Sequence, residues 1–215
     1  MRETVLTPAR PPARLPTRSP VRPRRGTPAE TRARLVATAA AVFNRVGYRG
    51  TDSNRLARAA GYAPGTFYKH FPDKRAAFLA AYEAWVTTEW AAIARVVAEG
   101  GDPAAVAARL VDMILALHRR WRGLRASLRA LVAEDRVARR FYTHQRRRQL
   151  ELLLRLRSPG RAARRPRAED AVVLYTLERV CDAAADGELR DLRVGVEPTV
   201  AVLRALVRPL LQDRP

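Results

Sequence analysis

Apolar residues recur along most of this chain three and four positions apart, the spacing that gathers them on one face of an α-helix. The first such face follows a capping box, in which Thr27 can cap a helix and Glu30 can reach back, with Pro28 at the first helical position. Its members are Leu35, Ala39, Val42, Phe43 and Val46, and Gly47 follows as a stop signal. Long β-branched runs with period-two alternation are absent, so the pattern favours an all-α fold.

Eight further helices are predicted after the first. They cover about residues 51–60, 64–71, 74–98, 103–117, 121–131, 137–156, 168–186 and 197–211. Thr51 and Asp73 are the expected caps of the second and fourth helices, and Gly61 is expected to end the second. The chain is therefore expected to contain about nine helices and no strands.

Two of these helices predict a helix-turn-helix. A tight turn through Gly61 would join helix 51–60 to helix 64–70, and the second helix of such a pair can enter the major groove of DNA. Gly65 carries no side chain, so a DNA backbone could approach closely, and the start of the helix offers free backbone N–H groups. The hydrogen-bond donors of this helix are Thr66, Tyr68, Lys69 and His70, whereas Phe67 and Phe71 are expected to face the core.

The charge balance agrees with a polyanionic partner but does not identify one. The formal net charge is +20 and the sequence pI is about 11.6, which favours nucleic acid or an anionic membrane surface. Lys69 and Lys74 are the only lysines, so nearly all of the positive charge is arginine. Because heavy Arg, Ala, Gly and Pro use is also typical of a GC-rich coding sequence, the charge supports DNA binding without establishing it.

Residues 1–26 differ in composition from the rest of the chain. They contain many prolines and arginines, few apolar residues and a single acid, Glu3, so this segment is expected to be disordered. One hypothesis is a basic arm that follows DNA phosphates or enters a minor groove. The alternatives are a solvated tail or a start codon assigned too far upstream.

The segment 47–74 resembles the signature of the TetR family of transcriptional regulators. The matching residues are Gly47, Tyr48, Thr51, Leu56, Ala57, Ala60, Gly61, Gly65, Thr66, Phe67, Tyr68, His70, Phe71 and Lys74. This ordered set is far more specific than a generic helix-turn-helix pattern. The resemblance covers about 50 residues when the first helix is counted, and the rest of the chain matches only in helix number and length.

The resemblance implies a DNA-binding surface on the second and third helices. Its residues would be Thr51, Asn54, Arg55, Ala63, Pro64, Gly65, Thr66, Tyr68, Lys69, His70 and Lys74. Of these, Thr51, Thr66, Tyr68, His70 and Lys74 would lie at or near phosphates. Lys69, Asn54, Arg55, Ala63 and the neighbouring Tyr62 would lie nearer to base edges or flanking phosphates. Phosphate contacts fix the register of the protein on DNA, and base-edge contacts carry the choice of sequence.

Three residues depart from the family pattern. Ser53 stands where the family usually has an apolar residue, and Asp52 complements the helix dipole but would repel a phosphate. Ala63 stands where Ser or Thr usually caps the recognition helix, a loss that should cost about 1 kcal/mol of local stability. These departures bear on sequence specificity more than on the fold.

The resemblance also implies a division into domains: a helix-turn-helix domain at 27–73 and an effector-binding and dimerisation domain at 74–215. The family usually dimerises through its last two long helices, here 168–186 and 197–211, although their apolar stripes could instead complete the core of a monomer. The candidates to line a pocket for a small-molecule effector are Trp85, Trp90, His118, Trp121, Phe141, Tyr142, His144 and Tyr175, each of which could equally be a core residue.

Other classes of function find little support. The sequence has no Gly-rich phosphate loop, nucleophile elbow or convincing acid pair, so it is not expected to be an enzyme or to need a cofactor. The histidines are not at metal-ligand spacing, and the lone Cys181 is expected to be a buried structural residue. No run of about 18 apolar residues predicts a membrane helix, the N-terminus lacks the apolar part of a secretory signal, and a cytoplasmic location is expected.

The sequence therefore predicts a sequence-specific transcriptional regulator that binds double-stranded DNA. A ligand-responsive repressor that binds a palindromic operator as a homodimer is the expected form. The alternative is a non-specific, arginine-rich nucleic-acid-binding protein that uses the N-terminal segment and Arg146 to Arg148. A steep salt dependence without sequence preference would identify that alternative.

Overall fold

The computed structural model describes residues 26–157, 166 and 168–212, and these ranges contain helices but no strands. The helices are α1 (Pro28–Val46), α2 (Ser53–Ala59), α3 (Pro64–Tyr68), α4 (Lys74–Glu99), α5 (Pro103–Arg120), α6 (Arg122–Glu134), α7 (Arg136–Arg157), α8 (Ala168–Asp186), α9 (Glu188–Asp191), α10 (Val196–Val207) and α11 (Pro209–Gln212). This confirms the all-α prediction. The N-terminal segment 1–25, including most of the predicted arm, lies outside the described residues. In the described ranges, none of the helices has the length and apolar character needed to cross a membrane.

The nine predicted helices are present, with three differences. The cap of α2 is Asp52 rather than Thr51: its Oδ1 accepts the backbone N–H of Arg55 at 2.8 Å. The predicted last helix divides into α10 and α11 at Pro209, because proline has no N–H with which to continue the helical hydrogen bonds. The short helix α9 was not predicted, since four residues are too few to show an apolar period.

The capping box at the start of α1 is confirmed. Thr27 Oγ1 accepts the N–H of Glu30 at 3.2 Å, and the N–H of Thr27 donates to Glu30 Oε2 at 2.8 Å. The helix ends at Gly47, whose φ of 73° is readily adopted only by glycine.

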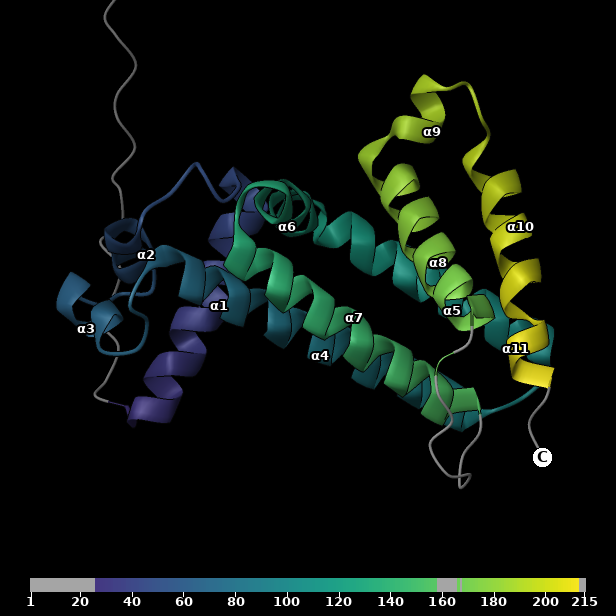
Figure 1. Cartoon of the computed structure of the whole chain (residues 1–215), viewed down its shortest axis with the longest axis horizontal. Helices are drawn as coiled ribbons and strands as arrows, with labels where there is room; N and C mark the ends of the chain where they lie inside the picture. The colour runs from purple at the N-terminus through teal and green to yellow at the C-terminus, as the bar shows by residue number, and fades with distance from the viewer. Residues whose placement is uncertain (1–25, 158–165, 167, 213–215) are drawn as a thin grey trace, which may run out of the picture.

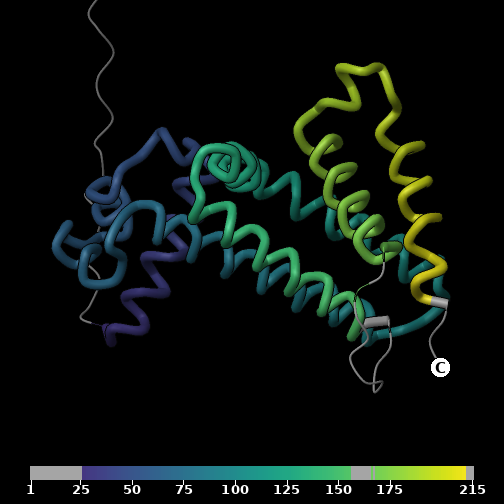
Figure 2. Tube along the Cα trace, viewed as in Figure 1, coloured from purple at the N-terminus to yellow at the C-terminus, as the bar shows by residue number. Residues whose placement is uncertain are grey.

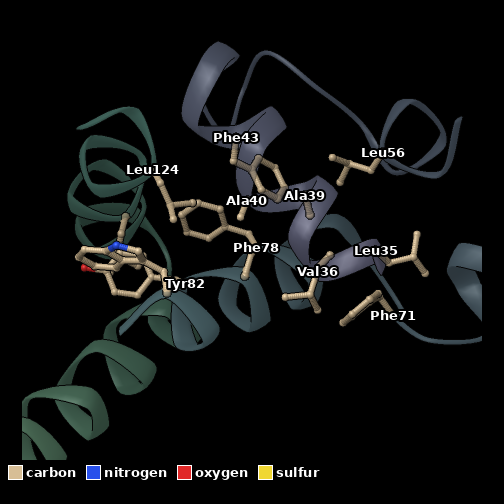
Figure 3. Close-up of a cluster of buried hydrophobic side chains, with 14 of the residues drawn as sticks. Leu35, Val36, Ala39, Ala40, Phe43, Leu56, Phe71, Phe78, Tyr82 and Leu124 are labelled. Carbon is tan, nitrogen blue, oxygen red and sulfur yellow. The ribbon is translucent and has the colours of Figure 1, made fainter. Parts of the chain in front are cut away.

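The core of the N-terminal helices continues into the C-terminal helices (Figure 3). Phe43 of α1 meets Phe78 of α4 edge to face, with ring centroids 5.0 Å apart. Leu56 of α2 and Leu124 of α6 belong to the same buried cluster. The DNA-binding module is therefore packed against α4 and α6 and is not an independently cored unit. The proposed domain boundary falls between Asp73, which caps α4, and Lys74 at the start of that helix.

The remaining helices extend away from this module along the long axis of the molecule (Figures 1 and 2). The long helix α4 runs beside α7, and α5, α8 and α10 pack together at the far end. A second buried cluster there includes Val111, Cys181 and Leu203, one from each of these three helices. Burial raises the pKa of the Cys181 thiol to about 12, which agrees with the predicted structural role of this cysteine.

Candidate DNA-binding surface and ligand cavity

A turn that needs glycine joins α2 to α3. Gly61 has a φ of 84°, in the left-handed region, and the N–H of Tyr62 donates to the carbonyl of Ala57 at 2.9 Å. Leu56 and Ala57 of α2 and Phe67 of α3 are buried, so both helices are held on the core by their inner faces. The arrangement is the helix-turn-helix that the sequence predicts.

The outer side of α3 is accessible along its length. A Cβ atom added to Gly65 would meet no atom within 4 Å, Tyr68 is 52% exposed, and Lys69 is also exposed. Thr66 and His70 are half-buried. Phe67 and Phe71 face inward, as expected, at 1% and 3% exposure. Ala63 forms no side-chain cap, as its departure from the family pattern implies. This side of α3 can therefore approach a partner closely.

The outer side of α2 lies next to that surface. Asn54 and Arg55 are exposed, and Arg55 makes only a long contact of 3.4 Å from Nη1 to the carbonyl of Gly50. Asp52, in contrast, uses its carboxylate to cap the helix. Asn54 and Arg55 are thus the side chains of α2 that remain available for a partner among those expected to bind DNA.

Two residues expected at phosphates have internal roles instead. Lys74 Nζ donates to the carbonyls of Tyr48 and Thr51, both at 2.9 Å, and lies 4.2 Å from the centroid of the Tyr48 ring. Thr51 itself is 7% exposed. The ammonium group therefore ties the loop between α1 and α2 to the start of α4. The family signature does not distinguish such a positioning lysine from one that contacts phosphate.

Asn44 links the DNA-binding module to α6. Its Nδ2 donates to the carbonyl of Arg120 at 2.8 Å, and its Oδ1 accepts the N–H of Leu124 at 3.1 Å. The approach is very close at Gly123, where an added Cβ would lie 2.0 Å from the carbonyl oxygen of Asn44. The N–H of Tyr48 also donates to Ser127 Oγ of α6 at 3.0 Å. We call these contacts the α1–α6 joint.

A cavity has Arg125 of α6, the neighbour of Leu124, in its lining. Its empty space, including open solvent at its mouth, is about 870 Å³. The lining comes from α4, α5, α6, α7, α8, α10 and α11: Glu89, Trp90, Ile93, Val97, Leu110, Ile114, His118, Arg125, Arg146, Gln149, Leu153, Leu174, Leu177, Glu178, Val207, Leu210 and Leu211.

Two of the eight predicted pocket residues, Trp90 and His118, line this cavity. The others lie elsewhere for identifiable reasons. Trp85 lies beneath Arg125, Trp121 beneath Arg120, and Phe141 packs edge to face on Tyr82. Tyr142 and Tyr175 flank the guanidinium group of Arg146, and His144 is exposed.

A buried network of charges forms one wall of the cavity. Arg125 donates from Nε to Asp182 at 2.6 Å and from Nη2 to Glu178 at 2.6 Å. Arg146 pairs with the other oxygen of Glu178. His118 Nδ1 lies 2.9 Å from Asp182 Oδ1. Burial alone would raise the pKa of Asp182, but the hydrogen bonds from His118 and Arg125 outweigh it and hold this pKa well below its usual range.

Sequence reasoning missed most of this network. It assigned no role to Glu89 and expected the run 146–148 to be a basic surface. The available signal was the placement of acids among buried positions: Glu89 on the apolar face of α4, and Glu178 and Asp182 one turn apart on α8. An acid on an apolar face is buried only if it is paired or serves a site.

The chain is similar to known regulators. Residues 35–81 match the family model described as bacterial regulatory proteins, tetR family. A putative TetR-family regulator from Mesorhizobium loti superposes with a TM-score of 0.66 at 18% identity, covering 87% of this chain and 98% of that one. A TetR-family regulator from Streptomyces coelicolor gives 0.58 at 22% identity, covering 85% and 98%. FadR from Bacillus subtilis in complex with stearoyl-CoA gives 0.58 at 15% identity, covering 85% and 99%. None of the curated proteins searched matches the chain.

The fold and the surface on α2 and α3 define a helix-turn-helix protein with a helical C-terminal domain. Together with the matched family model, they show a TetR-type DNA-binding region at residues 35–81, in a chain that has the fold of TetR-family transcriptional regulators. The resemblance stated from residues 47–74 is thereby confirmed.

The charge network predicts a pH-dependent loss of stability in Asp182→Asn. Removing this carboxylate leaves Arg125 buried with only part of its counter-charge, so the free energy of unfolding should fall by about 3 kcal/mol or more at pH 7. Because the folded pKa of Asp182 is lowered, its contribution is present above the pKa of about 4 of an unfolded aspartate and is lost as the pH falls. Urea unfolding from pH 7 to pH 3 should show a constant difference between the two proteins down to about pH 4 that begins to narrow below it, because the folded pKa lies well under that of an unfolded aspartate.

Asp186→Asn is the matched control on the same helix, because Asp186 is exposed and pairs with Arg129. The free energy of unfolding of Asp186→Asn should fall by less than about 1 kcal/mol. Equal losses in the two variants would contradict the buried network.

Proposed function

We propose that the protein is a ligand-responsive repressor that binds a palindromic operator as a homodimer, with α3 as its recognition helix. The observation that carries the proposal is the accessible outer side of α3, where Gly65 meets no other atom and Tyr68 and Lys69 are exposed. The effector would bind in the cavity that Arg125 of α6 lines.

On DNA, the exposed residues of α2 and α3 have different roles. Gly65 permits close approach of the backbone, and Tyr68, Thr66 and His70 donate to phosphates. Lys69 and Asn54 lie nearer to base edges, together with Arg55, Ala63 and Pro64. Thr51 and Lys74 act from behind this surface, because their contacts fix the loop that precedes α2. Repression follows when the bound dimer occupies a promoter.

The homodimer is supported by apolar side chains that α8 to α10 leave uncovered. The inward residues of these helices, such as Cys181 and Leu203, complete the core of the single chain, as the alternative interpretation of their stripes predicted. A second apolar set remains exposed: Val172, Tyr175, Leu192, Val194, Val202 and Leu206. Exposed apolar side chains concentrated on adjacent elements are typical of a protein interface. A second copy would cover them about a two-fold axis.

The α1–α6 joint connects the cavity to the recognition helix. Arg125 lines the cavity, and the N–H of its neighbour Leu124 donates to Asn44 of α1. An effector that favours a different position of α6 would therefore move α1 and, with it, α2 and α3. Because two recognition helices must meet major grooves about 34 Å apart, a small rotation is enough to weaken operator binding.

The non-specific alternative loses part of its support from the same structure. Arg146 is buried in the charge network rather than displayed on the surface, and Arg148 lies 3.6 Å from Glu83. Of the run expected to coat nucleic acid, Arg147 alone is exposed.

The experiment that tests the proposal is selection of bound duplexes from a random DNA pool at near-physiological salt. The expected result is a two-fold symmetric motif with half-sites about one helical turn apart, or a small multiple of it. Recovery of no enriched motif would contradict the proposal and favour the non-specific protein.

Substitutions on α3 are expected to weaken binding to the selected operator without affecting the fold. Gly65→Ala adds a methyl group where the protein has free space but DNA must approach, and Tyr68→Ala and Lys69→Ala remove donors. Each should lower affinity by about tenfold or more, and Lys69→Ala should also reduce the salt dependence if the lysine contacts a phosphate.

Fluorescence anisotropy measures affinity, and circular dichroism with chromatography checks fold and dimer. Arg95→Ala, exposed on α4, is the control. Wild-type affinity in all three variants would show that α3 is not the recognition helix.

A charge in the proposed interface should separate the dimer. Leu206→Glu places a carboxylate at a position that is 53% exposed in the single chain and covered in the proposed dimer. Burying it there costs several kcal/mol, so the dimer dissociation constant should rise by about a hundredfold or more. Sedimentation velocity checks the mass, and Val46→Glu, at 43% exposure on α1, is the matched control. An unchanged mass in Leu206→Glu would place the dimer interface elsewhere.

A further inference from the structure

The cavity has apolar walls and one charged end. Ile93, Leu110 and Leu211 represent the apolar walls, which come from α4, α5 and α11 among others. The charged end contains Glu89, His118 and the salt-bridged arginines. A ligand that fills this space needs an apolar body and one polar group, and the charged lining residues define which polar group it is.

The arginines at this end are already paired with carboxylates of the protein. Arg125 donates to both Asp182 and Glu178, with distances of 2.6 to 3.1 Å. Arg146 pairs with Glu178 and donates to Gln149 at 2.8 Å, and its guanidinium carbon lies 4.5 Å from the centroid of the Tyr142 ring. Of the buried guanidinium nitrogens of Arg125 and Arg146, Nε of Arg146 is the one that has no hydrogen-bond partner among the described residues. A carboxylate on a ligand would therefore have to displace Glu178 to gain a full ion pair.

Glu89 is the acid at this end that lacks such a partner. Its side chain is 7% exposed, and its Oε1 has no hydrogen-bond donor within reach among the described residues. The nearest cationic candidate, Nε2 of His118, lies 3.6 Å away, too far for a hydrogen bond. A buried carboxylate oxygen without a donor is costly, so Glu89 is the group that gains most from a bound cation.

Two further acids, Asp182 and Glu178, lie near Glu89, and both are engaged by arginines. Arg125 donates to both of them, and Arg146 pairs with Glu178. Arg129 also reaches Asp182 but is shared with Asp186. Among the described residues, Glu89 is therefore the acid of this group that no arginine contacts.

We propose that the effector of this site is an organic cation, an apolar molecule with a protonated amine that donates to Glu89 Oε1. The inference rests on the effector site proposed above. The ring of Trp90, the next residue on α4, also lines the cavity and supplies an aromatic surface that favours a cation.

Isothermal titration of the full-length protein with three ligands that share one alkyl chain tests the charge preference. Octylamine is protonated at neutral pH, octanol is neutral and octanoate is anionic, so the apolar contribution is the same in all three. The expected result is octylamine bound at least about tenfold more tightly than octanol, with octanoate weakest. Tightest binding of octanoate, or no binding of octylamine, would overturn the proposal.

Substitution of Glu89 tests the residue that we hold responsible. Glu89→Gln keeps the size of the side chain and removes its charge, so it should lower octylamine affinity by about tenfold or more and change octanol affinity by less than about twofold. Glu83→Gln, an exposed acid on the same helix, is the control and should change neither. Equal octylamine affinity in wild type and Glu89→Gln would overturn the assignment of Glu89. If the variant folds poorly, the order of the three ligand affinities in the wild-type protein still decides the charge preference.

Operator release separates this inference from the proposed function. Octylamine that binds through Glu89 and also dissociates the operator complex supports both. Octylamine that binds through Glu89 but leaves the operator complex intact supports the cation site and contradicts ligand-responsive repression at this site. Operator release by octanoate but not octylamine contradicts the cation site and leaves ligand-responsive repression standing.

Discussion

The close contact between α1 and α6 is the constraint on which the rest of this structure depends. Helices can approach so closely only because Gly123 has no side chain where the carbonyl of Asn44 passes. The two hydrogen bonds of Asn44 then fix α1 to the last residue of α5, Arg120, and to Leu124 near the start of α6. Phe43, Phe78 and Leu124 close the apolar core around the same contact. The recognition helix α3 packs mainly on α2, and α2 packs on α1, so the position of α3 depends on where the joint holds α1.

The charged wall of the cavity lies one residue away from that joint. Leu124 of α6 is bonded to Asn44 of the DNA-binding module. The next residue, Arg125, donates to carboxylates of α8, so α6 contacts both the module and the charge network. Breaking such a network leaves a buried charge, which makes its arrangements discrete rather than continuously adjustable. A ligand that redistributes these charges is therefore well placed to select between positions of α6. The arginines that stabilise the helices already pair with carboxylates of the protein, whereas Glu89 Oε1 has no donor among the described residues, so we infer that Glu89 is the group a ligand satisfies.

The sequence predicted the helices and the placement of the DNA-binding module well because those features are local. Capping residues, a turn glycine and apolar spacing act within a few positions of one another, and Thr27, Gly61, Phe67 and Phe71 are placed as predicted. The DNA contacts themselves stay predictions. The role of Lys74 could not be predicted in the same way, because it depends on non-local contacts. The fold brings the carbonyls of Tyr48 and Thr51 to its ammonium group.

The cavity was harder to predict because its lining comes from seven helices. Aromatic residues at helical spacing can face a core, a neighbouring helix or a cavity, so Phe141 and Trp121 were as plausible as Trp90. The one local signal was an acid in an apolar stripe, Glu89, and it lies at the charged end of the cavity.

The distance between the two copies of α2 in the proposed dimer tests whether the α1–α6 joint positions the recognition helices. A spin label at Arg58→Cys, exposed on α2, reports this distance by electron double resonance, and the buried native Cys181 does not compete for the label. One narrow distance distribution is expected in the wild-type background. In Asn44→Ala, the distribution should broaden or shift while helix content and dimer mass stay unchanged. The same narrow distribution in both proteins would show that the joint does not position the recognition helices.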